Sequence, residues 1–225
     1  MVEKSHLYIV STPIGNLEDI TLRALRVLRE VDAIICEETR EGSSLLKRLE
    51  ITTPALLTLN EHNEEEMSTE IVTRLARGQS LALISDCGTP VFSDPGHGLI
   101  RRLVEFQLSV VPVPGPSSLM AALSILDFKL EQFMFGGFLP RVPEERRKTL
   151  LKFKTLRVPI VLMDTPYRLA ALLEDIERIF GSGQVVTVGC DLTLPSETIY
   201  RGPLAEVRKQ AGKRKSEFIL IIHAS

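Results

Sequence analysis

The stretch that decides the fold is Leu81-Ala82-Leu83-Ile84-Ser85-Asp86-Cys87-Gly88-Thr89-Pro90-Val91-Phe92-Ser93-Asp94-Pro95-Gly96. Its first four residues are all apolar, and such a run predicts a strand that is buried on both faces. The residues that follow are mostly turn formers, so we expect an irregular loop that leads to a helix starting near His97.

This loop is suited to holding a ligand. In open α/β sheets, ligands bind beyond the carboxyl ends of the strands, which is where such a loop would lie. Gly88 lets a ligand approach the backbone, Thr89 supplies a hydroxyl group, and Pro90 fixes the path of the chain. A simpler interpretation is that these residues only connect strand to helix, with Ser93 or Asp94 capping the helix.

The composition is that of an ordinary soluble protein. The chain has 225 residues, of which 44% are hydrophobic and 25% are charged. No apolar run is long enough to span a membrane, and residues 1–13 lack the apolar core of a signal peptide, so we expect a cytoplasmic location. Three scattered cysteines and four scattered histidines have no metal-ligand spacing, so no metal site is expected.

Charge is distributed unevenly along the chain. Residues 1–112 carry 11 basic and 17 acidic residues, whereas residues 113–225 carry 16 basic and 12 acidic ones. This asymmetry suggests two domains, with an anionic partner that contacts the second.

The first half alternates strands with helices. Strands are expected at 7–10, 31–36, 55–59, 81–84 and 108–113. The helix after the first loop should bury Leu22, Leu25 and Leu28, and another helix should start at Asn63 with Glu66 completing a capping box. Because strands alternate with helices, the sheet should be parallel, although the G-x-G-x-x-G dinucleotide fingerprint is absent.

The run Val113-Pro114-Gly115-Pro116 is the expected domain boundary, which gives domains at 1–113 and 114–225. In the second half, strands are expected at 132–138, 160–163, 185–188, 197–201 and 218–222, with helices at 143–154, 165–180 and 204–211. The irregular spacing of these strands favours a mixed or antiparallel sheet. The fold class is therefore α/β, with two α/β domains.

Six motifs, read together, resemble the tetrapyrrole methylase superfamily and, within it, the ribosomal RNA small subunit methyltransferase I family. They are Ser11-Thr12-Pro13-Ile14-Gly15-Asn16-Leu17-Glu18-Asp19, the loop at 85–96, Pro112-Val113-Pro114-Gly115-Pro116-Ser117, Glu61-His62-Asn63-Glu64, Gly137-Phe138-Leu139-Pro140 and Thr165-Pro166-Tyr167-Arg168. Each motif alone is weak, but their order and spacing match over nearly the whole chain.

The resemblance implies S-adenosylmethionine as methyl donor, bound in a cleft between the two domains of a homodimer, and 2′-O-methylation of a cytidine in 16S rRNA of the small ribosomal subunit. It assigns donor binding to a set of residues in both halves of the chain: Pro13, Gly15, Gly88, Thr89, Phe92, Ser117, Ser118, Met163, Gly189 and Ser216.

The acceptor side is less well defined. A ribose hydroxyl is a poor nucleophile, so a positioned base would help, and Glu37, Glu61 and His62 are the candidates. Glu61 and His62 have a purely structural alternative, since they precede a helix. Substrate contact is expected from Arg40, Asn63, Arg141 and Arg168, with further basic residues at 146–148 and 213–215.

The sequence departs from the family at acceptor-side positions. The usual E-D-T-R-H-T reads Glu37-Glu38-Thr39-Arg40-Glu41-Gly42, and the usual A-R-E-L-T-K reads Gly189-Cys190-Asp191-Leu192-Thr193-Leu194. Two alternatives to an rRNA methyltransferase therefore stay open. One is a methylase of a small molecule or another acceptor, and the other is a non-catalytic protein that binds S-adenosylmethionine.

Overall fold

The computed structural model describes residues 5–52, 55–92 and 94–224, and these divide into two compact units, Met1–Ser117 and Ser118–Ser225. The division lies after the expected boundary at 113/114. The reason is that residues 114–117 stay with the first unit: the Thr89 hydroxyl donates to the Pro116 carbonyl oxygen over 3.3 Å. A Cβ on Gly115 would also come within 3.0 Å of the Ser11 Cβ.

Unit 1 contains the parallel sheet that the sequence predicts. Its five strands have the order β3-β2-β4-β1-β5, and every adjacent pair is parallel. The strands are β1 (His6–Val10), β2 (Ala33–Cys36), β3 (Ala55–Thr58), β4 (Leu81–Ile84) and β5 (Ser109–Val113). All residues of β2 and β4 are buried, as their continuous apolar runs predict.

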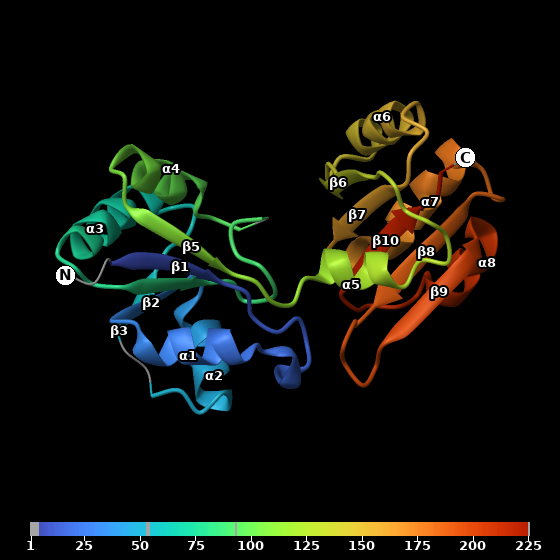
Figure 1. Cartoon of the computed structure of the whole chain (residues 1–225). Coiled ribbons are helices and arrows are strands. Elements are labelled where there is room, and N and C mark those ends of the chain that lie inside the picture. The colour runs from blue at the N-terminus through green and yellow to red at the C-terminus, as the bar shows by residue number, and fades with distance from the viewer. Residues whose placement is uncertain (1–4, 53–54, 93, 225) are drawn as a thin grey trace. The chain divides into compact units, whose positions relative to one another are not determined.

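Helices cover both faces of this sheet (Figure 1). They are η1 (Leu17–Asp19), α1 (Leu22–Glu30), α2 (Thr39–Arg48), α3 (Glu64–Ala76) and α4 (His97–Glu105). One core cluster joins α1 and α2 to one face of the sheet, and a second joins α3 and α4 to the other. The expected buried face of α1 was wrong at Leu22, which is 85% exposed. Leu28 is buried and Leu25 is partly buried, as expected, and Ala24 and Val27 complete the buried side of the helix.

The N-terminus of α4 is capped from another helix. The Glu64 carboxylate accepts hydrogen bonds from the backbone N–H groups of Gly96 and Gly98, at 3.1 and 2.8 Å. No side chain of α4's own N-cap residue, Gly96, is available for this role, and Ser93 lies outside the described residues. The predicted capping box was also wrong: α3 has no side-chain cap bond, because the Asn63 side chain accepts from Asn60 N–H instead.

Unit 2 is built on a mixed sheet with the order β6-β7-β10-β8-β9, in which only β6 and β7 are parallel. Its strands are β6 (Met134–Phe138), β7 (Ile160–Asp164), β8 (Val185–Cys190), β9 (Thr198–Pro203) and β10 (Phe218–Ile222). Its helices are α5 (Ser118–Ser124), α6 (Pro143–Lys154), η2 (Pro166–Arg168), α7 (Leu169–Phe180) and α8 (Leu204–Ala211).

The core of unit 2 lies mainly between its sheet and three helices. Leu150 of α6, Leu172 of α7 and Val207 of α8 pack with alternate residues of β7, β8 and β10. The opposite face of the sheet packs on α5 through Ala122, Val161 and Ile219. The expected mixed sheet is confirmed. The single helix expected at 165–180 is instead the short 3-10 helix η2 followed by α7.

Candidate functional site

The site in unit 1 forms where the chain leaves two neighbouring strands in opposite directions. β1 and β4 pair side by side, but β1 leads to α1 on one face of the sheet and β4 leads to α4 on the other. A divergence of this kind opens a crevice beyond the carboxyl ends of the two strands. The loops that were singled out from the sequence lie at this crevice.

Thr12 ties the two loops together. Its backbone N–H donates to the Gly88 carbonyl oxygen at 2.9 Å, which makes an antiparallel bridge. Its hydroxyl donates to the carbonyl oxygen of Ser85 at 3.0 Å, and its side chain is fully buried. The sequence analysis missed this role, because nothing in the sequence shows that a threonine after one strand lies beside a loop that follows another.

Gly88 and Thr89 occupy the centre of the crevice. Gly88 has φ +83°, and a Cβ there would lie 3.3 Å from the Ile14 Cγ2, so only glycine fits without strain. The Thr89 hydroxyl lies 3.0 Å from that of Ser11. Pro13 is buried beneath the loop, whereas Phe92 is exposed. The structure thus brings the expected residues Pro13, Gly88 and Thr89 together.

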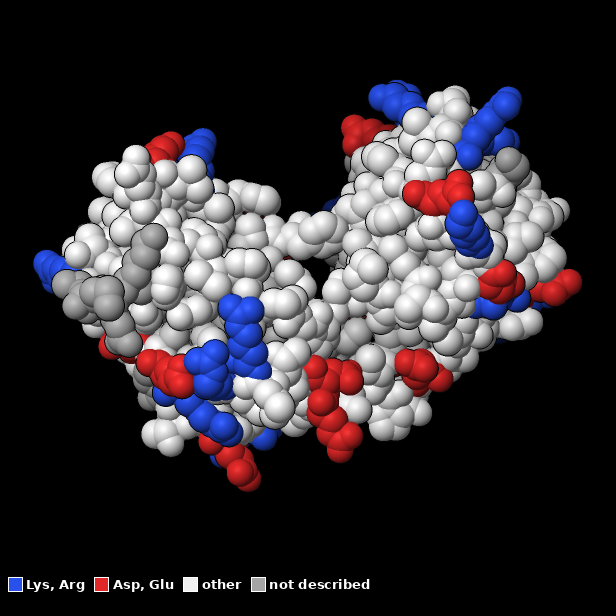
Figure 2. Space-filling model, in the orientation of Figure 1, with Lys and Arg blue, Asp and Glu red and all other residues white. Residues whose placement is uncertain are grey.

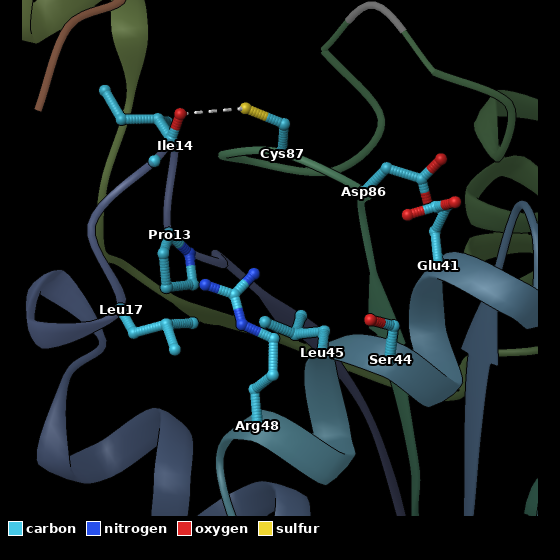
Figure 3. A pocket seen from close by; sticks show the side chains of 10 residues that line it. Pro13, Ile14, Leu17, Glu41, Ser44, Leu45, Arg48, Asp86 and Cys87 are labelled. Atoms are coloured by element: carbon cyan, nitrogen blue, oxygen red, sulfur yellow. Dashed lines mark hydrogen bonds between the residues drawn. The ribbon is translucent and has the colours of Figure 1, made fainter. Parts of the chain in front are cut away.

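A cavity of about 180 Å³ opens beside these loops (Figure 3). Its lining comes from the loop after β1, from α2 and from the loop after β4: Pro13, Ile14, Gly15, Leu17, Glu41, Ser44, Leu45, Arg48, Asp86 and Cys87. In Figure 3 the carboxylates of Glu41 and Asp86 face one another, and the Arg48 side chain extends toward Pro13. The cavity is therefore acidic on one side and basic on another.

Carboxylates gather along the carboxyl edge of this sheet. Partial burial raises the pKa of Glu37, and the carboxylates of Asp94, Asp86, Glu38 and Glu61 raise it further. Burial likewise raises the pKa of Asp86, with Glu41 as the strongest charged neighbour. Burial, and then repulsion by neighbouring carboxylates, therefore makes Glu37 and Asp86 more basic than isolated carboxylates.

The other expected base candidates are exposed. Glu61 and His62 follow β3, and their side chains are 80% and 84% exposed, with 3.5 Å between Glu61 Oε1 and His62 Nε2. Arg40, at the start of α2, is also exposed. The amide of Asn63 is already engaged, since it donates to the Thr58 carbonyl oxygen at 3.0 Å and accepts from Asn60 N–H.

The expected donor residues of unit 2 lie mostly at one end of its sheet. Met163 and Gly189 both pair with Ile219, on either side of β10, so they are placed in one row across three strands. Ser216 is buried just before β10, and its hydroxyl accepts from Arg214 Nε at 3.1 Å. Ser118 is the first residue of α5.

Several basic residues that looked free in the sequence are engaged. Arg146 is 5% exposed, and its Nε donates to the Asp175 carboxylate at 2.7 Å, while Arg147 contacts the other oxygen of Asp175 at 3.2 Å. Arg146 is therefore buried in an ion pair, and Arg147 is shared between Asp175 and Glu144, whose carboxylate lies 2.9 Å from Arg147 Nη2. Arg141 and Lys148 are exposed.

Arg214 is also turned inward, unlike its neighbours in the run Lys213-Arg214-Lys215. Its guanidinium donates to Thr198 Oγ1 at 2.7 Å and to Asp191 Oδ2 at 3.0 Å, and these bonds join the ends of β8 and β9. Lys213 and Lys215 remain exposed. Figure 2 shows lysine and arginine interspersed with acidic residues on the face that it presents, without a continuous basic band.

Neither a metal site nor a membrane span is found in the part of the chain that the structure describes. No group of three or more His, Cys, Asp or Glu side chains there could hold a metal ion. No helix there is long and apolar enough to cross a membrane.

Comparison with protein families gives one match over most of the chain. Residues 6–208 match the family of tetrapyrrole (corrin/porphyrin) methylases. Ribosomal RNA small subunit methyltransferase I of Xylella fastidiosa is 42% identical over 223 residues, which cover 97% of this chain and 81% of that relative. The protein with the same name from Escherichia coli O157:H7 is 39% identical and is covered to 78%.

Solved structures with the same fold include enzymes that are named as methyltransferases. A uroporphyrin-III C-methyltransferase from Thermus thermophilus, complexed with S-adenosyl homocysteine, superimposes with a TM-score of 0.67 at 19% identity and covers 97% of each chain. A diphthine synthase gives a TM-score of 0.74 at 15% identity, over 98% of this chain and 90% of that one. At these identities, the likeness concerns the fold.

Proposed function

The chain belongs to the tetrapyrrole methylase family and, within it, to the ribosomal RNA small subunit methyltransferase I family, and from this premise we propose that it methylates a ribose hydroxyl of 16S rRNA with S-adenosylmethionine as donor. The observation that carries the proposal is the similarity to these relatives over 97% of the chain, since it extends through both units. The two named tetrapyrrole methyltransferases among the solved structures, a cobalt precorrin-4 methyltransferase and a uroporphyrin-III C-methyltransferase, are only 18% and 19% identical to this chain.

The crevice in unit 1 fits the amino acid end of such a donor. Gly88 leaves open the space that a Cβ would fill beside Ile14, and the exposed Thr89 hydroxyl can exchange hydrogen bonds with a polar group. We assign donor binding to Pro13, Gly15, Gly88, Thr89, Phe92 and Ser117 of unit 1, and to Ser118, Met163, Gly189 and Ser216 of unit 2.

Methyl transfer needs positioning and a base more than a metal. When bound, S-adenosylmethionine supplies an electrophilic methyl carbon on a sulfonium. The protein then has to orient a ribose hydroxyl and accept its proton. We assign the base to Glu37, because it is partly buried and its pKa is raised above the ordinary value of a glutamate, whereas the side chain of Glu61 is exposed to solvent.

The acceptor would be contacted by exposed cations. Arg40 and Arg141 are exposed, so both can approach phosphate groups. Asn63 Nδ2 and Arg168 Nη2 donate to backbone carbonyl oxygens, and we assign to these two residues the positioning of the loops in which they lie. A homodimer in the cytoplasm is part of the same proposal.

The decisive experiment measures transfer of a labelled methyl group to small ribosomal subunits that lack 16S rRNA methylation. Naked 16S rRNA and a protein extract serve as the other acceptors. Label in the 16S rRNA, mapped to a ribose, supports the proposal. Tight donor binding by calorimetry without label in the rRNA would contradict it and would favour another acceptor or a binding protein.

The assignment of the donor loop has its own test. In a Thr89→Val, Ser117→Val double variant, two hydroxyl groups that can bond the donor are lost, so we expect donor affinity to fall roughly 10-fold or more. Calorimetry with S-adenosylmethionine measures this directly. A Thr39→Val variant, changed at an exposed threonine of α2, is the control. Unchanged affinity in the double variant would show that these hydroxyl groups do not hold the donor.

A further inference from the structure

Tyr167 projects into solvent from the turn that follows β7. It lies within η2, and it is 80% exposed, which leaves almost the whole ring free of packing. The only aromatic or ionic contact described for its ring is with Lys215, whose Nζ lies 5.8 Å from the ring centroid. Such a ring can accept a flat partner on its face.

The turn that carries Tyr167 is held firmly. Arg168 donates to the carbonyl oxygens of Leu139 and Pro140 at 3.0 and 2.8 Å, and its Nη1 lies 3.1 Å from Asp164 Oδ1. Pro166 fixes the backbone on the other side of the tyrosine. Because both flanking residues are fixed, Tyr167 is presented with little backbone entropy left to lose on binding.

Asp164, the last residue of β7, forms an ion pair with Arg168 in this turn. Its side chain is fully buried, and within the described residues its Oδ2 has no hydrogen-bond partner. Burial raises the pKa of Asp164, whereas the Thr165 N–H and the Arg168 guanidinium lower it. A charged group of this kind is costly to bury, so the Asp164–Arg168 pair favours one conformation of the turn over others.

Cations surround the same end of the sheet. Phe218, the first residue of β10, pairs with Asp164, the last residue of β7, so the segment before β10 lies beside the Tyr167 turn. That segment contains the exposed Lys213 and Lys215. Arg141, also exposed, follows the strand that pairs with β7 and lowers the pKa of Asp164 through its charge. Lys215 thus contacts the ring of Tyr167, and Arg141 and Lys213 add positive charge at the same end of the sheet.

We propose that Tyr167 is a stacking platform for an unpaired RNA base, with Lys215, Lys213 and Arg141 contacting the adjoining phosphates. A duplex would not offer a base face to the ring, whereas a loop or single strand does. This proposal rests on the proposed function, because it names the part of the RNA acceptor that unit 2 contacts. The positive charge attracts any anionic partner, and the exposed ring favours RNA over an acidic protein surface, because every unpaired base offers a flat face for stacking.

The first test measures binding of an unstructured, end-labelled RNA of about 12 nucleotides by fluorescence anisotropy. We expect Tyr167→Leu to weaken binding about 5- to 150-fold and Tyr167→Phe to bind within about twofold of wild type, because phenylalanine keeps the ring. Lys215→Met should reduce the slope of log affinity against log salt by about 0.7, which corresponds to one phosphate contact. Phe106→Leu, at a 62% exposed aromatic residue of unit 1, is the matched control and should bind like wild type.

Competitors decide what the surface recognises. Unlabelled single-stranded RNA should displace the labelled RNA, and a duplex of the same length should not. The chain has three tyrosines and no tryptophan, so quenching of tyrosine fluorescence by RNA that is lost in Tyr167→Phe would place the base on this ring. Equal displacement by duplex RNA, or by an acidic peptide, would overturn the proposal.

Methyl transfer separates this proposal from the function on which it rests. If wild type methylates small subunits and Tyr167→Leu raises KM while kcat and donor affinity stay constant, the stacking role is supported. If wild type methylates them and Tyr167→Leu has an unchanged KM and RNA affinity, the stacking role is overturned and the function stands. If wild type transfers no methyl group to rRNA, the proposed function fails, whatever the binding assay gives.

Discussion

Glu37 is the residue whose surroundings most favour proton transfer. Its neighbours Asp94 and Asp86 are acidic, and together with burial they raise its pKa above the ordinary value of 4.5. Glu37→Gln removes the proton acceptor but keeps the size of the side chain, so we expect kcat to fall about 10²- to 10⁴-fold. Donor affinity, measured by calorimetry, should not change.

The pH profile gives a second measure of Glu37. A raised pKa means that the carboxylate is ionised only at higher pH, so the wild-type rate should rise as pH increases through a value above 4.5. The residual activity of Glu37→Gln should lack this rise. Glu61→Gln, at an exposed carboxylate on the same edge, is the control. A normal kcat in Glu37→Gln would mean that a group other than Glu37 accepts the proton of the ribose hydroxyl.

Thr12 acts on the loops through hydrogen bonds alone. Thr12→Val keeps the shape of the side chain and removes the hydroxyl that donates to the Ser85 and Gly88 carbonyl oxygens. We expect the free energy of unfolding to fall by about 1–3 kcal/mol, because two buried carbonyl groups lose a hydrogen-bond partner. Denaturation by urea measures this loss, and the affinity for S-adenosylmethionine should fall as well. Thr12→Ser restores the hydroxyl, and a loss of equal size there would rule out the hydrogen bonds as the cause.

At the scale of elements, one carboxylate links α3 to α4. Glu64 accepts from Gly96 and Gly98, so Glu64→Gln weakens charge-assisted hydrogen bonds at a helix N-terminus. We expect a loss of about 1 kcal/mol in the free energy of unfolding, measured by urea denaturation. Glu66→Gln, on the exposed side of α3, should leave stability unchanged. A similar loss in both variants would mean that the net charge of α3 is responsible.

The helices and strands were largely predictable, because hydrophobic periodicity and the turn-forming residues between elements are local properties of the sequence. The bounds of α6, α8 and β10 agree with those expected, since each has a proline or glycine at a boundary or a purely apolar run. Leu22 was misplaced because the buried side of α1 is centred on Ala24, Val27 and Leu28, and helical periodicity puts position 22 on the opposite side. The cap by Glu64 was missed because it joins residues more than thirty positions apart.

At the scale of the whole molecule, the stability of unit 2 should depend on His223. Burial lowers the pKa of this histidine below 6.5, Asp127 opposes that effect, and the ring accepts or donates a 2.9 Å hydrogen bond with Thr187. Below pH 6.5 the unfolded chain binds a proton that the folded unit does not, so stability is lost as pH falls through 6.5 toward the folded pKa. It is fully present at higher pH.

His223→Gln isolates this contribution. Glutamine keeps a partner for Thr187 but does not titrate, so the difference in urea midpoint between wild type and variant should change between pH 8 and pH 5, in favour of the variant at the lower pH. His97→Gln, at an exposed histidine of unit 1, is the control and should follow wild type. A pH-independent difference would contradict a titrating role for His223.

The candidate site was only partly predictable, and the reason is spatial. The loop at Gly88 could be found from its turn-forming residues, because a close approach of two backbone segments demands particular residue types. Thr12 and the Arg146–Asp175 pair could not be found, because each depends on a partner supplied by a distant element. The stacking ring of Tyr167 stood within a recognised motif, but its exposure is a property of the folded surface.

The confinement of each core cluster to one unit has an evolutionary consequence. The cluster around Leu150 is built from residues of unit 2, and the cluster around Leu99 from residues of unit 1. A substitution that weakens one cluster can be compensated within that cluster, because packing defects are repaired by neighbours in contact. Selection therefore acts on the stability of each unit separately. Second-site mutations that suppress a core mutation in this chain should map to the unit that carries the original mutation.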